Sequence, residues 1–275
     1  MIWHNNKVVW RAPGFELDEN PFPAVRAIRG EIFRQVAERV TLRFEQQGNT
    51  YFLKYHRGVG WREIVKNLLF FRLPVLGAEN EWRAIRLLEK QGVPTMRLVA
   101  YGQQGWNPAG RESFVITEEL KPTVSLEDFF KGPERESTGL AMKRRLIAEV
   151  AAMTRAMHRA GMNHRDLYIC HFLLHTDRLA QGEVKLSLID LHRAQLREQV
   201  PTRWLAKDLA SLYFSALPAQ LSRRDELRFL KHYFDSPLRE TLRSNRQQLK
   251  WIKKESERLQ KKYLRKYAPD ESTLK

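Results

Sequence analysis

The sequence predicts an α+β protein with two lobes, a small β-rich lobe followed by a larger helical one. Alternating apolar and polar residues, typical of strands, are concentrated in the first 120 residues, whereas apolar residues at helical spacing dominate afterwards. With 275 residues and 43% hydrophobic content, the chain can bury the core that two lobes need. We therefore divide it into residues 1–120 and residues 121–275.

The first lobe is expected to contain a hairpin and two helices. Residues 1–30 show no sustained period and are predicted to form an arm leading into the first sheet. Residues 41–56 contain two alternating runs around a Gly-Asn turn, which predicts a β-hairpin. Apolar residues at helical spacing predict two helices between residues 61 and 92, on either side of Gly77. MRLVAYG and SFVITEEL are predicted to be short strands.

The second lobe begins after a predicted hinge at residues 118–122. A helix is expected to end near Gly161, followed by the strand FLLH, the polar turn TDRLAQGE and the strand KLSLID. Helices are predicted from Trp204 onward, and Ser222 with Asp225 forms the pattern of a capping box.

Charge and cysteine content limit the class of protein. The balance of 48 Lys+Arg against 32 Asp+Glu gives a net charge of +16, which predicts attraction to anionic surfaces such as lipid, nucleic acid or acidic protein. The single cysteine, Cys170, cannot form an internal disulfide. We find no signal peptide and no run of about 18 apolar residues. A cytoplasmic protein is therefore expected.

Half of the net charge lies in the basic segment 239–266. It contains eleven Lys/Arg and three Glu, a net of +8, and its apolar residues fall at helical spacing. Such a helix could lie on an anionic membrane, bind an acidic protein partner, or pack on its own lobe with its charged face outward.

The sharpest local pattern is His164-Arg165-Asp166, between a helix end and a strand, with Asp190 at the end of a later strand. It brings two carboxylates to the turns of neighbouring strands, one to accept a proton from a hydroxyl and one to bind a metal ion. The pattern resembles the catalytic loop and the D-F-G metal site of protein kinases. Lys54, at the end of an apolar strand, then corresponds to the phosphate-binding lysine, and Glu81 to its carboxylate partner.

Several positions depart from the protein-kinase pattern. No G-x-G-x-x-G precedes Lys54, so the sequence leaves open how phosphates would be covered. His171 stands where protein kinases have a metal-binding Asn, and it is expected either to bind metal or to hydrogen-bond nearby, since imidazole suits softer metals than magnesium. His192 replaces the Gly of D-F-G, and no A-P-E segment follows.

Three further residues are expected to support the catalytic loop. Asp208, in KDLA, resembles the aspartate with which small-molecule kinases hold the backbone of this loop. The alternative is a carboxylate at a helix N-terminus, favoured by the helix dipole. His164 and Arg165 are expected to be structural supports and not chemical participants.

A more specific resemblance is carried by WRAIRLL, VITEEL, NHRDLYICHFLLH, IDLHRAQL and KDLASLYFSAL. Together they resemble the lipopolysaccharide core heptose(I) kinase family, a Kdo/heptose kinase group of the protein-kinase-like superfamily, from about Gly30 to Pro237. The resemblance implies ATP and magnesium as cofactors and the first heptose of the lipopolysaccharide core as acceptor. It also implies a peripheral location at the cytoplasmic face of the inner membrane. Glu118 of VITEEL joins Lys54 and Glu81 as an expected nucleotide-binding residue.

Other functions remain open at this point. A Kdo kinase would share the chemistry, whereas an aminoglycoside-type phosphotransferase is disfavoured by the charge of +16, because its substrates are polycations. A pseudokinase or a nucleic-acid-binding protein is also disfavoured, because binding alone needs none of Lys54, Glu81, Asp166 and Asp190.

Overall fold

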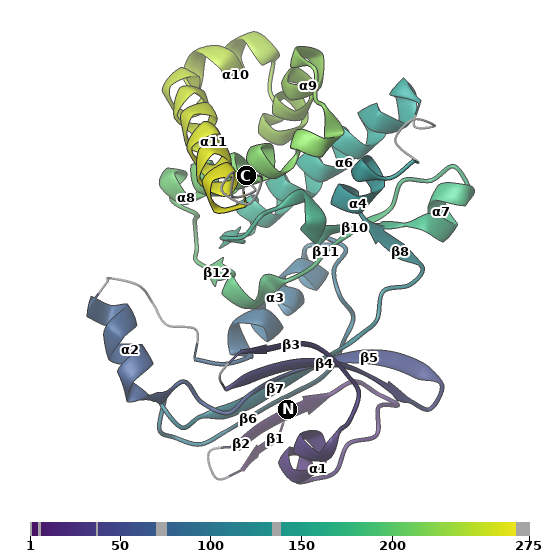
Figure 1. The fold of residues 1–275 in the computed structure, drawn as a ribbon, viewed down its shortest axis with the longest axis vertical. Helices are drawn as coiled ribbons and strands as arrows, with labels where there is room; N and C mark the ends of the chain where they lie inside the picture. Colours follow the sequence, from purple (N-terminus) through teal and green to yellow (C-terminus); the bar gives the residue numbers. More distant parts are fainter. Residues whose placement is uncertain (1, 5–6, 37, 70–75, 134–138, 268–275) are drawn as a thin grey trace, which may run out of the picture. The chain divides into compact units, whose positions relative to one another are not determined.

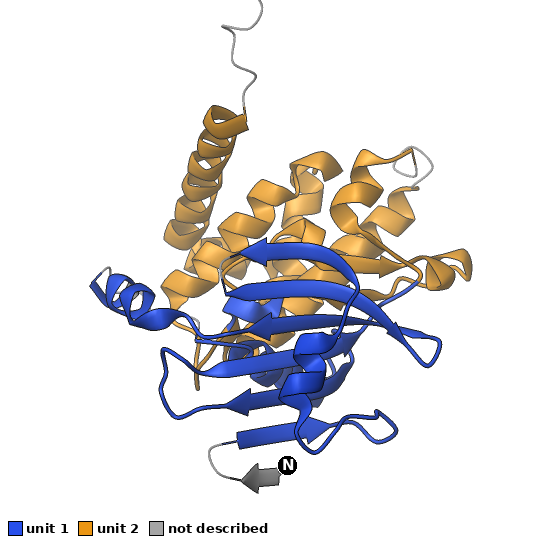
Figure 2. Ribbon diagram, turned by 60° about the horizontal axis from the view of Figure 1, so that its bottom comes forward, with its two compact units in different colours: residues 1–121, 190–194 blue, residues 122–189, 195–275 orange. Residues whose placement is uncertain are grey.

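The computed structural model describes residues 2–4, 7–36, 38–69, 76–133 and 139–267. The described chain forms two compact units (Figure 2). Unit 1 consists of Met1–Lys121 together with the short segment Asp190–Ala194, and unit 2 consists of Pro122–Ile189 and Gln195–Lys275. The protein therefore has an N-terminal antiparallel sheet and a helical C-terminal part, which confirms the predicted α+β class.

Unit 1 is built on an antiparallel seven-stranded sheet with the strand order β1-β2-β6-β7-β5-β4-β3 (Figure 1). Its strands are β1 (Ile2–His4), β2 (Lys7–Arg11), β3 (Glu31–Val36), β4 (Arg39–Gln46), β5 (Asn49–His56), β6 (Leu98–Gln104) and β7 (Glu112–Glu118). Its helices are α1 (Pro21–Ala27), α2 (Gly60–Leu69) and α3 (Glu79–Lys90), and the one-turn helix η2 (Leu191–Arg193) belongs to it as well.

Two helices cover opposite faces of this sheet (Figure 1). On one face, Phe22 of α1 packs edge-on against Phe114 of β7, with ring centroids 5.3 Å apart. On the other face, Trp82 of α3 stacks on Tyr101 of β6 at 4.6 Å. Because side chains alternate along a strand, Lys54 lies on the α3 face while its buried neighbour Leu53 joins the core on the α1 face.

The prediction of an arm for residues 1–30 was wrong. β2 pairs along β6 from Lys7↔Gln104 to Arg11↔Ala100, and α1 follows with Phe22 buried. These elements have five and seven residues, so neither is long enough to show a period in the sequence. These two elements are stabilised by contacts with the rest of the unit, and such contacts leave no periodic signal in the sequence.

The predicted hairpin of residues 41–56 is confirmed as β4 and β5. Its strands pair from Arg39↔His56 to Gln46↔Asn49. Gln47 and Gly48 make the turn with φ of 51° and 75°, a left-handed pair that matches the twist of a two-residue hairpin. This turn fixes the register that places Lys54 opposite Thr41.

Unit 2 is mainly helical. Its helices are α4 (Leu126–Lys131), α6 (Leu140–Arg159), α7 (Thr176–Ala180), α8 (Thr202–Ser215), α9 (Arg223–Phe234), α10 (Leu238–Ser244) and α11 (Arg246–Tyr267). One-turn helices lie at η1 (Ile169–His171) and η3 (Leu217–Ala219). The capping box at Ser222 and Asp225 is confirmed at the start of α9.

Short strands complete unit 2. β8 (Thr123–Ser125), β10 (Phe172–His175) and β11 (Leu186–Leu188) form one sheet, and β9 (Met162–Asn163) pairs with β12 (Gln195–Leu196). The segment TDRLAQGE, predicted to be a polar turn, contains the helix α7, whose five residues are too few for a periodic signal. Gly161, with φ of 82°, lets Arg197 approach so closely that an added Cβ would lie against its carbonyl oxygen.

No helix in the described part of the chain is long and apolar enough to cross a bilayer.

Candidate active site

Lys54 and Glu81 form a buried ion pair in unit 1. The Nζ atom of Lys54 lies 2.5 Å from Oε1 of Glu81, and the side chain of Glu81 is only 1% exposed. Lys54 comes from β5, near the middle of the sheet, and Glu81 from the first turn of α3. A carboxylate this deeply buried requires a cation, so the pair holds the Lys54 amine in one position.

Asp190 meets the same lysine. Its Oδ1 atom lies 3.5 Å from Lys54 Nζ and 2.6 Å from Nδ1 of His192. The short segment Asp190–Ala194 belongs to unit 1 because η2 contacts α3. Asp190 has φ of 62°, a left-handed conformation that aspartate tolerates better than most residues. The structure thus brings together the three residues predicted from the kinase pattern, Lys54, Glu81 and Asp190.

His56 lies behind this group and was not identified from the sequence. Its side chain is buried, and burial, reinforced by the positive charges of Arg39 and Lys54, lowers the pKa of His56 to about 3. The imidazole is therefore neutral at pH 7. The hairpin register is the signal that could have found it, since His56 follows Lys54 by two positions and shares its face of the sheet.

The catalytic-loop residues lie in unit 2, held by Asp208. Oδ2 of Asp208 accepts the backbone N–H of His164 at 2.6 Å, and Oδ1 accepts that of Arg165 at 2.9 Å. Asp208 is 1% exposed and lies in the middle of α8, beyond the first turn of the helix. The alternative of a carboxylate favoured by a helix N-terminus is therefore wrong, and Asp208 fixes the turn in which Arg165 takes φ of 73°.

Behind Asp208, two further side chains extend the buried network. Nε2 of His158 lies 3.3 Å from Oδ2 of Asp208, and Nδ1 of His158 lies 2.8 Å from the hydroxyl of Tyr233. Burial raises the pKa of Tyr233, so its hydroxyl stays protonated. The sequence carried no signal for this contact, because Tyr233 is 75 residues away from His158.

Two histidines flank Asp166, and their tautomers follow from their partners. Nδ1 of His171 lies 2.8 Å from the backbone carbonyl of Asp166, and Nε2 of His164 lies 3.0 Å from that of Ile189. A carbonyl can only accept, so each of these ring nitrogens donates. The two rings stack with centroids 5.6 Å apart. His164 thereby ties the loop to the residue before Asp190.

Glu118 is placed differently from the other predicted nucleotide-binding residues. It pairs opposite Tyr51, so its side chain starts on the face of the sheet opposite to that of Lys54. Its carboxylate lies 3.1 Å from Arg97. The side chain is thus not brought to the Lys54 cluster, and a nucleotide contact by Glu118 stays a prediction.

The site residues fit a magnesium nucleotide. Asp190 is 29% exposed and offers hard carboxylate oxygens, and Lys54 carries a charge for phosphate. In the residues that the structure describes, no group of three or more His, Cys, Asp or Glu side chains forms a metal cage.

A sheet with a paired lysine and glutamate, and a helical unit with an H-R-D loop held by a buried aspartate, indicate a protein of the kinase-like class. The lipopolysaccharide kinase (Kdo/WaaP) family model matches residues 23–233. The chain belongs to this family and is an ATP-dependent sugar kinase, as predicted.

Relatives cover nearly the whole chain. This chain is 54% identical over 241 residues to lipopolysaccharide core heptose(I) kinase WaaP of Pseudomonas aeruginosa. The aligned residues make up 87% of this chain and 90% of the relative. This chain is also 49% identical over 249 residues to the Escherichia coli protein of the same name, covering 90% of this chain and 94% of the relative. A solved structure, WaaP in complex with acyl carrier protein, matches with a TM-score of 0.77 and 47% identity, covering 89% of this chain and 98% of that one.

Proposed function

We propose that this protein transfers the γ-phosphoryl group of ATP to a hydroxyl of the first heptose of the lipopolysaccharide inner core. The observation that carries the proposal is the contact of Lys54 Nζ with both Glu81 and Asp190, at 2.5 Å and 3.5 Å. Such an arrangement serves phosphate and metal binding together. The heptose acceptor is supported by the names of the relatives, which favour it over Kdo.

Each residue has a distinct role in this proposal. Lys54, held by Glu81, binds the phosphates, and Asp190 is the protein's magnesium ligand. Bound Mg²⁺ would neutralise charge that develops on the transferred group. Asp166 accepts the proton of the attacking hydroxyl, and Asp208 fixes the backbone that aims Asp166. In this transfer the bond between the heptose oxygen and the γ-phosphorus forms, the bond between the γ-phosphorus and the β,γ-bridging oxygen breaks, and ADP leaves.

For His171 we favour a positioning role over metal binding. Its ring is fixed by donation to the Asp166 carbonyl and by stacking on His164. Imidazole is a poor ligand for magnesium. By holding the carbonyl of Asp166, His171 constrains the residue whose carboxylate acts as the base.

The experiment measures ATP consumption with purified rough lipopolysaccharide, with and without magnesium. We expect turnover only when both are present, and its loss in Lys54→Met. Lys66→Met, on the exposed surface of α2, is the matched control and should keep activity. Equal ATP consumption with and without lipopolysaccharide would contradict the proposal.

We further propose that the protein works at an anionic membrane, the cytoplasmic face of the inner membrane. The support is α11, whose Lys253, Lys254, Lys261 and Lys262 are all exposed. Lysines near such a surface contribute about 1 kcal/mol each. The acceptor is itself anionic, since Kdo carries carboxylates and lipid A carries phosphates.

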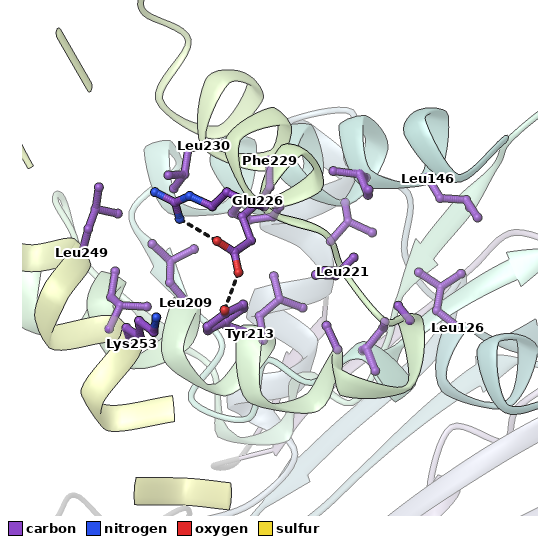
Figure 3. A pocket seen from close by; sticks show the side chains of 18 of the residues that line it. Leu126, Leu146, Leu209, Tyr213, Leu221, Glu226, Phe229, Leu230, Leu249 and Lys253 are labelled. Atoms are coloured by element: carbon purple, nitrogen blue, oxygen red, sulfur yellow. Dashed lines mark hydrogen bonds and ion pairs between the residues drawn. The ribbon is translucent and has the colours of Figure 1, made fainter. Parts of the chain in front are cut away.

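A protein partner is proposed on a separate observation. Unit 2 contains an apolar cavity whose walls come from α4, α6, α8, α9, α10 and α11 (Figure 3). It is lined among others by Leu126, Leu146, Leu209, Leu230 and Leu249. Among the lining residues, Glu226 accepts a hydrogen bond from Tyr213 at 2.5 Å and pairs with Arg223, and Lys253 of α11 also lines the cavity (Figure 3). Because the solved structure of the related WaaP contains acyl carrier protein, we propose that an acyl carrier protein binds here, with its acyl chain in the cavity and an acidic face against α11.

This partner is tested by affinity measurements with acyl carrier protein in its unacylated form and with chains of increasing length. Burial of each additional methylene contributes about 0.8 kcal/mol, so affinity should rise with chain length until the cavity is filled. Equal affinity for acylated and unacylated forms would rule out a role of the cavity.

A further inference from the structure

Arg39 begins β4, the strand that pairs with β5, which carries Lys54. The register pairs Arg39 with Val36 at the end of β3. Only Ala37 and Glu38 stand between them in the sequence. The sequence between the two strands contains no glycine, so it lacks the glycine-rich pattern whose backbone N–H groups bind phosphate in other kinases.

The hairpin aims Arg39 at the Lys54 cluster. Arg39 lies directly opposite His56, and Lys54 lies opposite Thr41, so Arg39 and Lys54 are diagonal neighbours on one face of the sheet. The charge of Arg39 contributes to the lowered pKa of His56. Burial lowers the pKa of Arg39 itself, and the carboxylates of Glu81 and Asp190 act against this effect. Arg39 is thus close enough to both carboxylates to interact with their charges.

One donor of the half-buried Arg39 guanidinium lacks a hydrogen-bond partner in the described part of the chain. Its Nε atom is buried and has no hydrogen-bond partner among the residues that the structure describes. Arginine cannot lose its proton in a protein, so it remains a desolvated cation with an unused donor. An anion with several acceptor oxygens, placed between Arg39 and Lys54, would satisfy both.

We propose that Arg39 binds the triphosphate of the nucleotide, in place of the backbone amides of a glycine-rich loop. This inference rests on the proposed function, because it assumes that ATP binds at the Lys54 cluster. The guanidinium is suited to the task, since it donates in a fixed fork that matches phosphate oxygens. Arg39 would then be a nucleotide-binding residue, and the reacting hydroxyl would not contact it.

The test compares nucleotide affinities of wild type, Arg39→Met, Arg39→Lys and the control Arg83→Met. Arg83 lies on the exposed side of α3 in the same unit, so its replacement removes the same charge away from the cluster. Affinities for ATP, ADP, AMP and adenosine are measured by competition in the presence of magnesium. A charge-assisted hydrogen bond predicts that Arg39→Met weakens ATP binding about tenfold to a hundredfold.

Three outcomes support the inference together. First, the loss of nucleotide affinity in Arg39→Met grows from AMP to ATP and is absent for adenosine. Second, its KM for the lipopolysaccharide acceptor does not change. Third, Arg39→Lys recovers part of the ATP affinity. Unchanged ATP affinity in Arg39→Met overturns it. An equal loss for adenosine and ATP, with a lower melting temperature, also overturns it, because this would indicate a structural role.

The same data separate this inference from the proposed function. If wild type and Arg83→Met fail to bind magnesium-ATP, both the proposed function and the assignment of Arg39 are wrong. If they bind it and Arg39→Met binds it equally well, the nucleotide site stands and only the assignment of Arg39 is wrong.

Discussion

The Nζ atom of Lys54 lies 3.5 Å from Oδ1 of Asp190, although the two residues stand far apart in the sequence. The contact is possible because the segment Asp190–Ala194 packs on α3, in the unit that contains Lys54. Lysine and aspartate in this position define where phosphate and metal would lie. In the proposed function, nucleotide binding and proton transfer belong to different residues, so each role can be tested separately.

Asp190→Ala is expected to abolish both turnover and magnesium-dependent ATP binding, because the metal bridges the protein and the phosphates. Calorimetric titration with ATP, with and without magnesium, measures the effect. Magnesium-ATP affinity equal to that of wild type would show that Asp190 is not the ligand.

Asp166→Ala should have a different effect. Removing a positioned base is expected to lower kcat by about 10² to 10⁴ while ATP affinity changes little, because Asp166 takes no part in nucleotide binding. Single-turnover rates and a parallel ATP titration separate the two quantities. Full turnover by this variant would show that Asp166 is not the base.

The lowered pKa of His56 should make the stability of the protein depend on pH. Its pKa falls from 6.5 to about 3 on folding, so below pH 6.5 the unfolded chain binds a proton that the folded chain does not. The free energy of unfolding should then decrease as the pH falls from about 6.5 towards 3, by at most roughly 1.4 kcal/mol per pH unit for one proton. Denaturant unfolding of wild type and His56→Leu between pH 7 and 5 measures this.

In His56→Leu this part of the slope should be missing, whereas His232→Gln, at an exposed position of α9, is the control. Identical pH slopes in wild type and His56→Leu would mean that His56 is not buried in its neutral form.

Because the surface of α11 is basic, we expect turnover to depend on whether the acceptor lies in an anionic membrane. Changing Lys253, Lys254, Lys261 and Lys262 to Gln should weaken action on lipopolysaccharide in anionic membranes more than on a short soluble core oligosaccharide, because only the membrane presents an extended anionic surface. The difference should fade with salt, as the Debye length falls to roughly 3 Å at 1 M. A salt series with both acceptors measures it.

A control with Lys66, Lys90, Lys131 and Lys185 changed to Gln removes the same charge from exposed positions elsewhere. The idea is wrong if the α11 variant keeps the wild-type ratio of membrane-bound to soluble turnover at every salt concentration.

The sequence predicted those features that depend on local pattern or on a specific motif. The hairpin that carries Lys54 was found from its alternation, and Glu81 and Asp190 were found from the order of motifs along the chain. β2 and α1 were missed because they are short and depend on contacts with β6 and Phe114. His56, Arg39 and the Tyr233–His158 contact were missed for a related reason, since register and tertiary packing decide them.

The most direct test of the account is to locate the transferred phosphate. Wild-type protein is incubated with γ-labelled ATP, magnesium and two lipopolysaccharides, one truncated after the first heptose and one ending at Kdo, and the products are analysed by mass spectrometry. We predict label on the heptose of the first acceptor and none on the second. Label on Kdo, or no transfer to either acceptor, would contradict the proposal that this family member phosphorylates the first heptose.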